Sequence, residues 1–347
     1  MKKSHKIIMK YKVHILLMVL IFGFISCNEI KKEKPKKVAF SEKTGPKENY
    51  IFSTLISKNG TIVLQEYYNG KTKDSLCDVQ SLTKGIMSIL VGIAIDKKFI
   101  ENENETIEKY FKNEFQNIKN EKKKNITIKH LLNQTSGLSW NGYLEHEKWL
   151  NSENPSLFVL QKNLENEPGE KYNYNSGATH LLSVILSKAS GKTTLEFANE
   201  YLFKQLNINQ VNWKKRNQGY YDGSGLGLKM KPVDLMKIGQ LLEKKGKWNG
   251  KQIVSEKWVE KLFNKNEKKP TKWGLRNSKH GYCWYKSELK GNIVNYGMGY
   301  GGQFIILVPN KNLIIVATHN HDTPKGIEQQ MKFLYGKLPI LIEKYGG

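Results

Sequence analysis

Segments typical of β-strands lie at both ends of this 347-residue chain, and segments typical of helices lie between them. Apolar and β-branched residues dominate the strand-like segments, whereas the helix-like segments carry apolar residues three and four positions apart. The expected strands are 50–57, 61–68, 281–286, 292–297, 303–308 and 313–318, and the expected helices are 81–98, 128–133, 156–163, 177–188, 194–206, 234–245 and 326–344. This order predicts an α+β fold, in which an antiparallel sheet built from both chain ends is flanked by helices and carries an inserted, mostly helical lobe at 100–245.

The first 27 residues are typical of an export signal. Lysines precede an apolar run over 13–26, which is too short to span a bilayer comfortably but suits the core of a signal peptide. The run ends in a sequence that resembles a bacterial lipobox, with Cys27 as the residue that would be lipidated; an ordinary cleaved signal or a membrane anchor is the alternative. We therefore expect a flexible basic tether over 28–47, a folded domain over 48–347, and a location in the cell envelope, on a bacterial membrane.

The formal net charge of +24 raises the hypothesis of a nucleic-acid partner. The charge is nearly all lysine, because Arg216 and Arg276 are the only arginines, and it is scattered through Asn- and Lys-rich segments without a groove-reading motif. We therefore expect no nucleic-acid partner. Weak attraction to anionic lipid or wall polymers stays open.

Cysteine and histidine give no sign of a metal site. If Cys27 is lipidated, Cys77 and Cys283 remain in an oxidising compartment, where the sequence is compatible with a disulfide or with two buried thiols. His130 and His180 lie in apolar helix patterns and are expected to be core or capping residues rather than ligands. We expect no metal and no cofactor.

A serine and a lysine three residues apart mark the start of an apolar helix. Residues at i and i+3 share a helix face, so the ammonium group of Lys84 can reach the hydroxyl of Ser81. Ser81 would also lie at a helix N-terminus, where free backbone N–H groups favour developing negative charge. A second S-x-x-K match, Ser287 to Lys290, has no helix behind it. The segment at Ser81 therefore predicts a nucleophile, its base and half of an oxyanion site.

Two further polar segments are candidates for the same site. Tyr174 and Ser176 lie on a turn-forming stretch that enters a helix, where a tyrosine beside a lysine could transfer protons. The stretch 296–303 holds four glycines in front of a strand-like run, which permits close backbone approach to a ligand. Taken alone, the first could be a packed loop tyrosine and the second a glycine-rich bulge.

The three elements in this order resemble the serine β-lactamase and penicillin-binding-protein superfamily. The resemblance is closer to its class C-like branch of esterases and amidases, which includes 6-aminohexanoate-dimer hydrolases. It covers residues 48–345, and the supporting strings are 126–132, 135–138, 225–228, 246–250 and 301–303. The resemblance implies that Ser81 is the acylated nucleophile, Lys84 the base that activates it, and Tyr174 the residue that relays protons to the leaving group. Backbone N–H groups of Ser81 and Tyr300 would form the oxyanion hole.

The chain departs from the family pattern at two places. Ser176 stands where the Y-x-N pattern has asparagine, and Gly299-Tyr300-Gly301 replaces the usual K-T-G, so Ser176, Gly299 and Gly301 are the expected substrate contacts. In the family the lysine and threonine help to bind the carboxylate of β-lactams and D-Ala-D-Ala peptides. Their loss removes a charge-assisted contact worth about 1.5–3 kcal/mol, which argues against efficient β-lactamase or D,D-peptidase activity.

The sequence therefore predicts an exported serine hydrolase that cleaves small ester or amide bonds through an acyl-enzyme on Ser81. Trp140 and Tyr143, which follow the turn at Ser136-Gly137, are candidates for an aromatic substrate wall. One alternative is a D,D-peptidase or β-lactamase acting on cell-wall peptides or β-lactams. Another is a non-catalytic wall- or ligand-binding protein with the same fold.

Overall fold

The computed structural model describes residues 50–264, 267–268 and 273–347. The predicted signal peptide, Cys27 and the tether over 28–47 lie outside these residues. Among the helices that are described, none is both long and apolar enough to cross a membrane.

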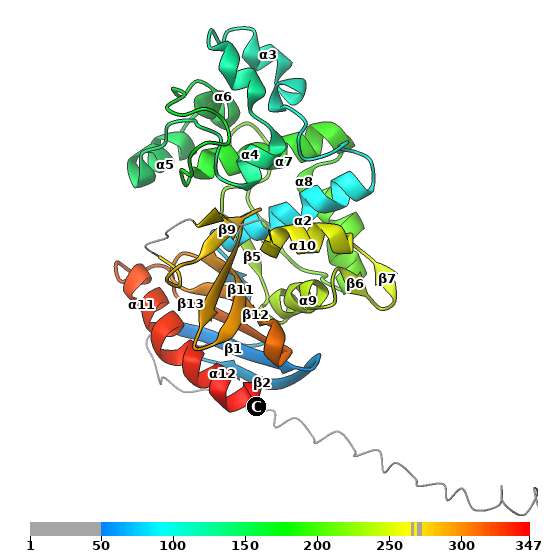
Figure 1. The fold of residues 1–347 in the computed structure, drawn as a ribbon, viewed down its shortest axis with the longest axis vertical. Coiled ribbons are helices and arrows are strands. Elements are labelled where there is room, and N and C mark those ends of the chain that lie inside the picture. Colours follow the sequence, from blue (N-terminus) through cyan, green and yellow to red (C-terminus); the bar gives the residue numbers. More distant parts are fainter. Residues whose placement is uncertain (1–49, 265–266, 269–272) are drawn as a thin grey trace, which may run out of the picture. The chain divides into compact units, whose positions relative to one another are not determined.

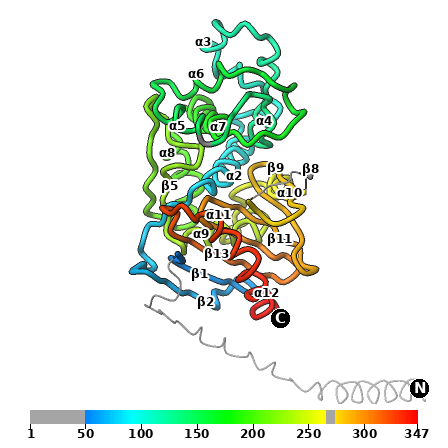
Figure 2. The backbone as a smooth tube through the Cα atoms, turned by 90° about the vertical axis from the view of Figure 1, so that its left-hand side faces the viewer, coloured from blue at the N-terminus to red at the C-terminus, as the bar shows by residue number. Residues whose placement is uncertain are grey.

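One antiparallel sheet contains strands from both ends of the described chain (Figure 1). Its order is β2-β1-β13-β12-β11-β10-β9-β8. The bounds are β1 (Ile51–Lys58), β2 (Thr61–Tyr67), β8 (Glu267–Lys268), β9 (Lys279–Gly281), β10 (Trp284–Leu289), β11 (Asn292–Gly299), β12 (Gln303–Val308) and β13 (Leu313–His319). Figure 2 shows β1 beside β13, and the register places Ile51 opposite His319 and Lys58 opposite Leu313.

Both faces of the sheet centre are covered, because successive side chains of a strand point to opposite faces. On β13, Ile314 and Val316 join the apolar cluster that contains α2 (Leu82–Asp96) and α9 (Pro232–Glu243). The intervening Leu313, Ile315 and Ala317 join a second cluster with Phe333 and Leu338 of the C-terminal helices. A strand buried on both faces favours apolar residues at successive positions, which explains the uninterrupted apolar runs 304–308 in β12 and 313–317 in β13.

The helices between α2 and α9 gather around α7 (Ser176–Ser190), which contacts α2, α4, α5, α6 and α8. In Figure 1 most of them lie at the far side of α2 from the sheet. Their bounds are α3 (Lys112–Phe115), α4 (Ile128–Leu132), α5 (Gly142–Leu150), α6 (Pro155–Leu160) and α8 (Thr194–Ala198). Helix α10 (Glu256–Asn264) packs instead on β9 and β10, and the C-terminal helices are α11 (Gly326–Lys332) and α12 (Leu338–Gly346). A small sheet consists of β3 (Cys77–Asp78), β5 (Leu228–Met230) and β4 (Asn212–Trp213), and β6 (Lys247–Trp248) pairs with β7 (Lys251–Gln252).

The predicted α+β fold, with a sheet built from both ends and helices between, is confirmed. The expected strand 281–286 is wrong in its first part, because Tyr282 and Cys283 have φ values of 50° and 65° and form a two-residue turn between β9 and β10. The expected single helix 326–344 is interrupted by a π-helical turn over Phe333–Lys337. The bounds of the helical lobe stay a prediction, and α9 within them packs on β1, β12 and β13.

Candidate active site

Ser81, Lys84 and Tyr174 meet in space, although Tyr174 is distant in the sequence. The Nζ of Lys84 lies 3.1 Å from Ser81 Oγ, and the Tyr174 hydroxyl donates to the same Oγ at 2.8 Å. Lys84 Nζ also lies 4.9 Å from the centre of the Tyr174 ring. Ser81 Oγ therefore accepts hydrogen bonds from two donors, so negative charge that develops on this oxygen is stabilised from two sides.

Ser81 is the N-cap residue of α2, and the chain before it is tightly turned. Gln80 has a φ of 49°, and both its backbone and side-chain N–H groups donate to Asp78 Oδ1, at 3.0 and 3.1 Å. The free N-terminus of α2 therefore begins at the serine, as the sequence predicts. Lys84 follows one turn later and is only 3% exposed.

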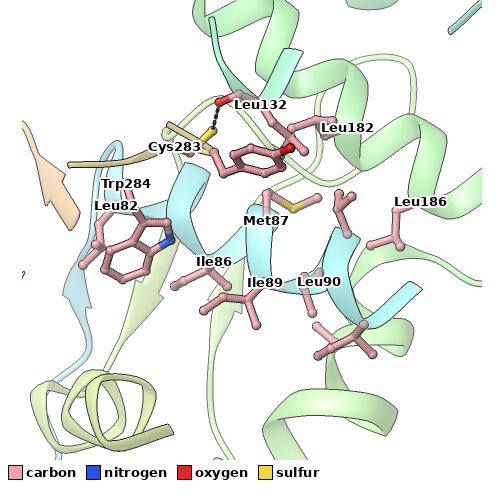
Figure 3. Packing of buried hydrophobic residues seen from close by; sticks show 14 of the residues in the cluster. Leu82, Ile86, Met87, Ile89, Leu90, Leu132, Leu182, Leu186, Cys283 and Trp284 are labelled. Atoms are coloured by element: carbon pink, nitrogen blue, oxygen red, sulfur yellow. Dashed lines mark hydrogen bonds between the residues drawn. The ribbon is translucent and has the colours of Figure 1, made fainter. Parts of the chain in front are cut away.

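Two tryptophans hold α2 from the sheet side. The indole N–H of Trp284 donates to the Gly85 carbonyl at 3.2 Å, and that of Trp258 donates to the Ser88 carbonyl at 3.0 Å. Figure 3 shows α2 between Trp284 on one side and Leu182 and Leu186 of α7 on the other. The helix that carries the nucleophile is therefore fixed between the sheet and the helical lobe.

A loop centred on Asp222 forms the wall opposite the start of α2. Asp222 is fully buried, and its Oδ1 accepts from the backbone N–H groups of Ser224, Gly225 and Leu226 at 2.8, 2.8 and 3.1 Å. Its Oδ2 lies 2.8 Å from Arg216 Nε. Such a carboxylate-centred turn, paired with a guanidinium, fixes the backbone of the whole loop.

This loop contacts both Ser81 and Lys84. The Ser224 carbonyl accepts a hydrogen bond from Lys84 Nζ, which orients the amine. Gly225 has a φ of 115°, and a Cβ atom there would lie 2.7 Å from Ser81 Cα and 3.0 Å from Ser81 Oγ. Only glycine fits this position, because of both its backbone conformation and the close approach.

Tyr174 lies just before α7, and one further aromatic residue flanks it. Asn175 caps α7 by accepting from the Ala178 N–H at 2.8 Å, so the tyrosine is held next to a fixed helix start. The ring of Trp273 packs edge-on against the Tyr174 ring with centroids 5.8 Å apart, and Trp273 is 42% exposed. Trp273 therefore offers an apolar surface at the open side of Tyr174.

The glycine-rich stretch forms the end of β11 and the turn to β12. A Cβ atom at Gly299 would lie 2.3 Å from the Val79 carbonyl oxygen, so this strand end lies against the chain just before Ser81. The Tyr300 hydroxyl donates to the Thr323 carbonyl at 3.2 Å, and a Cβ atom at Gly301 would meet His321. The backbone N–H of Tyr300 as an oxyanion donor, and Gly299 and Gly301 as substrate contacts, stay predictions.

The other predicted site residues differ in their surroundings. Ser176 is the first residue of α7 and is 5% exposed. Trp140 is 8% exposed, and its ring packs edge-on against that of Trp149, so most of it lies in the helical core. Tyr143 is in α5, and its side chain lies outside what the structure describes. The substrate roles of these three residues stay predictions.

Burial shifts the pKa values of a cysteine and a histidine near the site, Cys283 and His180. Cys77 and Cys283 are both free thiols, and burial raises the pKa of Cys283 to about 12, so it is no nucleophile at neutral pH. Burial lowers the pKa of His180 to about 4, and this neutral ring accepts from the Gly223 N–H at 3.3 Å through Nδ1. The described residues contain no group of His, Cys, Asp and Glu side chains that could hold a metal ion.

Sequence reasoning missed Asp222, Arg216 and Trp273. A signal existed for the first pair, since Arg216 is one of only two arginines and Asp222 precedes a Gly-Ser-Gly turn. Nothing in the local sequence connects Trp273 with Tyr174, because the two residues are about a hundred positions apart in the sequence.

Comparison with known proteins agrees with this geometry. The beta-lactamase family profile matches residues 52–336. Among solved structures, a candidate 6-aminohexanoate-dimer hydrolase from Bacillus anthracis is 21% identical, with a TM-score of 0.70 over 85% of this chain and 80% of that one. An octameric penicillin-binding protein homologue from Pyrococcus abyssi is 18% identical, with a TM-score of 0.67 over 86% and 74%. A D-stereospecific amidohydrolase from a Streptomyces species is 15% identical, with a TM-score of 0.61 over 83% and 93%.

At these identities the structural likenesses show the fold alone, and no curated protein matches the sequence. The family match is broader, since it spans most of the chain and its range includes Ser81, Lys84 and Tyr174. The chain belongs to the beta-lactamase family.

Proposed function

We propose that this protein is an exported serine hydrolase that cleaves small ester or amide bonds through an acyl-enzyme on Ser81. One observation carries the proposal: Ser81 Oγ lies within hydrogen-bond distance of both Lys84 Nζ, at 3.1 Å, and the Tyr174 hydroxyl, at 2.8 Å. This is the arrangement that an activated nucleophile requires. Export rests on the N-terminal sequence alone.

In the proposed acylation step, Ser81 Oγ attacks the carbonyl carbon and its proton passes to Lys84 Nζ. Tyr174 gives its hydroxyl proton to the leaving alcohol or amine as the bond to the carbonyl carbon breaks, and it regains a proton from Lys84. The Ser224 carbonyl keeps Lys84 directed at this exchange. A water molecule then attacks the acyl-enzyme, and the same groups return the proton to Ser81.

The substrate class follows from the surroundings of the site. The nearest described cation is Lys84 itself, which the mechanism uses, and Gly299-Tyr300-Gly301 offers no charged side chain in place of K-T-G. A substrate carboxylate would therefore lack a charge-assisted partner there. Trp273 beside Tyr174 instead favours an apolar group on the leaving side of the scissile bond.

The test is covalent labelling of residues 46–347 with a fluorophosphonate and, separately, with a fluorescent penicillin, with the modified residue identified by mass spectrometry. We expect the fluorophosphonate to modify Ser81, S81A to stay unlabelled, and penicillin not to react. Labelling by both reagents would favour a β-lactamase or D,D-peptidase. Labelling by neither would refute the mechanism and favour a binding protein.

A further inference from the structure

We infer that Gln134 is a positioning residue for Tyr174, a role that rests on the proposed function of the tyrosine in proton transfer. Gln134 follows the C-terminal end of α4 and contacts the chain on both sides of Tyr174. Its main-chain carbonyl accepts from the Asn173 N–H at 2.8 Å, and its side-chain Oε1 accepts from the Asn175 N–H at 2.7 Å.

The hydrogen bond from the Asn175 N–H fixes the peptide group between Tyr174 and Asn175, and the bond from the Asn173 N–H fixes the peptide group one residue before Tyr174's own amide. The direction of the bond from Cα to Cβ depends on the path of the backbone through this segment, so the two hydrogen bonds restrict where the tyrosine hydroxyl points. The hydroxyl reaches Ser81 Oγ at 2.8 Å from a segment that is neither helix nor strand. Gln134 therefore supplies the constraint that regular secondary structure would otherwise give.

The environment of Gln134 indicates that its side chain is needed rather than merely tolerated. Gln134 has a φ of 59° and is 1% exposed. Lys98 and Lys245 make comparable left-handed turns after α2 and α9, but both are exposed. Gln134 Nε2 is buried, and no partner for it occurs among the described residues. An apolar side chain would avoid this desolvation, so the accepted hydrogen bond at Oε1 is what the amide contributes.

The segment that carries Gln134 is itself fixed to the sheet. The Leu132 carbonyl accepts from the Cys283 N–H at 3.0 Å and from its thiol, the contact drawn as a dashed line in Figure 3. Asn133 Oδ1 accepts from the Tyr282 N–H at 3.1 Å. The buried turn between β9 and β10 thus holds the end of α4, and Gln134 extends this support from the sheet to Tyr174.

A positioning role predicts a specific kinetic signature. Tyr174 matters most when the leaving group needs a proton, as ethoxide does, and least when it departs as a stabilised anion, as p-nitrophenolate does. A variant that misplaces Tyr174 therefore loses activity on ethyl acetate more than on p-nitrophenyl acetate. The two esters share one acyl group, so they form the same acyl-enzyme. A general loss of folded protein would lower both rates equally.

The experiment measures kcat/KM for both esters in the wild-type protein, Q134M and Q134N. Methionine keeps the length of the side chain without a strong acceptor, and asparagine suits the left-handed turn but is too short to reach Asn175. We expect a fall of about 10- to 100-fold on ethyl acetate and about threefold or less on p-nitrophenyl acetate in both variants. K98M, a matched change at an exposed left-handed turn, keeps the wild-type ratio.

An unchanged ratio of the two rates in Q134N and Q134M, whether both rates fall together or neither falls, would overturn the assignment. If Q134M does not fold, Q134N decides alone. A wild-type protein that hydrolyses neither ester and is not labelled at Ser81 would instead refute the proposed function, which is a separate result.

Discussion

Two glycine-containing segments close around the start of α2, and they are held in different ways. The loop 222–226 is built around a buried charge, because the Asp222 carboxylate accepts three backbone N–H groups and pairs with Arg216. The turn 299–302 is held by neutral groups. Gln329 donates to the Gly301 carbonyl at 2.6 Å, and His319 Nδ1 lies 2.6 Å from the Gly302 carbonyl oxygen.

The kind of support, charged or neutral, matches the part of the site that each segment contacts. The charged loop contacts two of the predicted catalytic residues, through the Ser224 carbonyl at Lys84 and Gly225 at Ser81. The neutral turn approaches Val79 and Gln80, just before Ser81, and contains Tyr300, the predicted second oxyanion donor. A buried carboxylate there would oppose that negative charge, whereas amide and imidazole groups do not. A buried charge thus supports the loop at Ser81 and Lys84, and neutral groups support the turn that holds the predicted oxyanion donor.

Replacement of Gly225 is expected to have the largest effect. In G225A the new Cβ atom would meet Ser81 Cα and Oγ, so we expect the rate of fluorophosphonate labelling to fall by about 100-fold or more. Gly219 is the matched control, because it has a φ of 89° and no atom within 4 Å of an added Cβ. G219A should label at nearly the wild-type rate, and equal rates in the two variants would show that the close approach at Gly225 is unimportant.

Removal of the charge at the centre of the first segment comes next. We expect D222N to lose about 3–5 kcal/mol in the free energy of unfolding, because Arg216 is left without its buried partner. The rate of hydrolysis by D222N should also fall, because the Ser224 carbonyl loses its fixed position. E328Q breaks an exposed pair with Lys332 and should leave the stability almost unchanged. Denaturant unfolding gives both values, and a D222N protein as stable as E328Q would contradict the comparison.

Loosening the neutral turn should have a smaller effect. Q329A removes the donor to the Gly301 and Asn320 carbonyls. We expect the activation free energy of ester hydrolysis to rise by about 1 kcal/mol, which makes the reaction about fivefold slower. Steady-state kinetics at pH 7 measure it. If Q329A were as damaging as D222N, the proposed distinction between charged and neutral support would be lost.

The smallest effect at neutral pH involves two histidines, one hydrogen-bonded to each segment: His180 to Gly223 and His319 to Gly302. Burial lowers the pKa of both His180 and His319 to about 4, below the ordinary value of 6.5. Well above pH 6.5 neither ring is protonated, in the folded protein or in the unfolded chain. Between pH 6.5 and 4 the unfolded chain binds protons that the folded protein does not, so stability falls by up to about 3 kcal/mol for each ring.

Asparagine at either position does not titrate, so H180N and H319N should each flatten the decrease in unfolding free energy from pH 7 to pH 4. Only at His180 does protonation also remove a hydrogen bond, because its Nδ1 accepts from the Gly223 N–H, whereas His319 Nδ1–H donates to a carbonyl in both forms. Acid should therefore loosen the charged loop first, which hydrogen exchange at Gly223 and Gly302 can follow. Equal protection at the two sites at pH 4.5 would contradict this.

The parts that could be predicted from sequence depend on local periodicity. The spacing of Ser81 and Lys84 on one helix turn, and the apolar run of β12, follow from the geometry of a single element. The contacts of Ser224 with Lys84 and of Trp273 with Tyr174 do not, because segments distant in sequence create them.

Local rules also fail where tertiary packing overrides them. The turn at Tyr282-Cys283 lacks the glycine or asparagine that usually marks left-handed residues, and its conformation is imposed by burial against the end of α4. No residue type in the sequence signals that turn.

The pairing of β1 with β13 has a consequence for the order of folding. Residues 51–58 leave the ribosome early, but they find their central partner only when residues 313–319 are available. Contacts so distant in sequence close slowly, because the intervening chain has to be ordered first. One edge of the hairpin of β1 and β2 therefore stays unpaired until β13 has been synthesised. Pairing of β13 then completes the sheet against which the serine-bearing helix is packed.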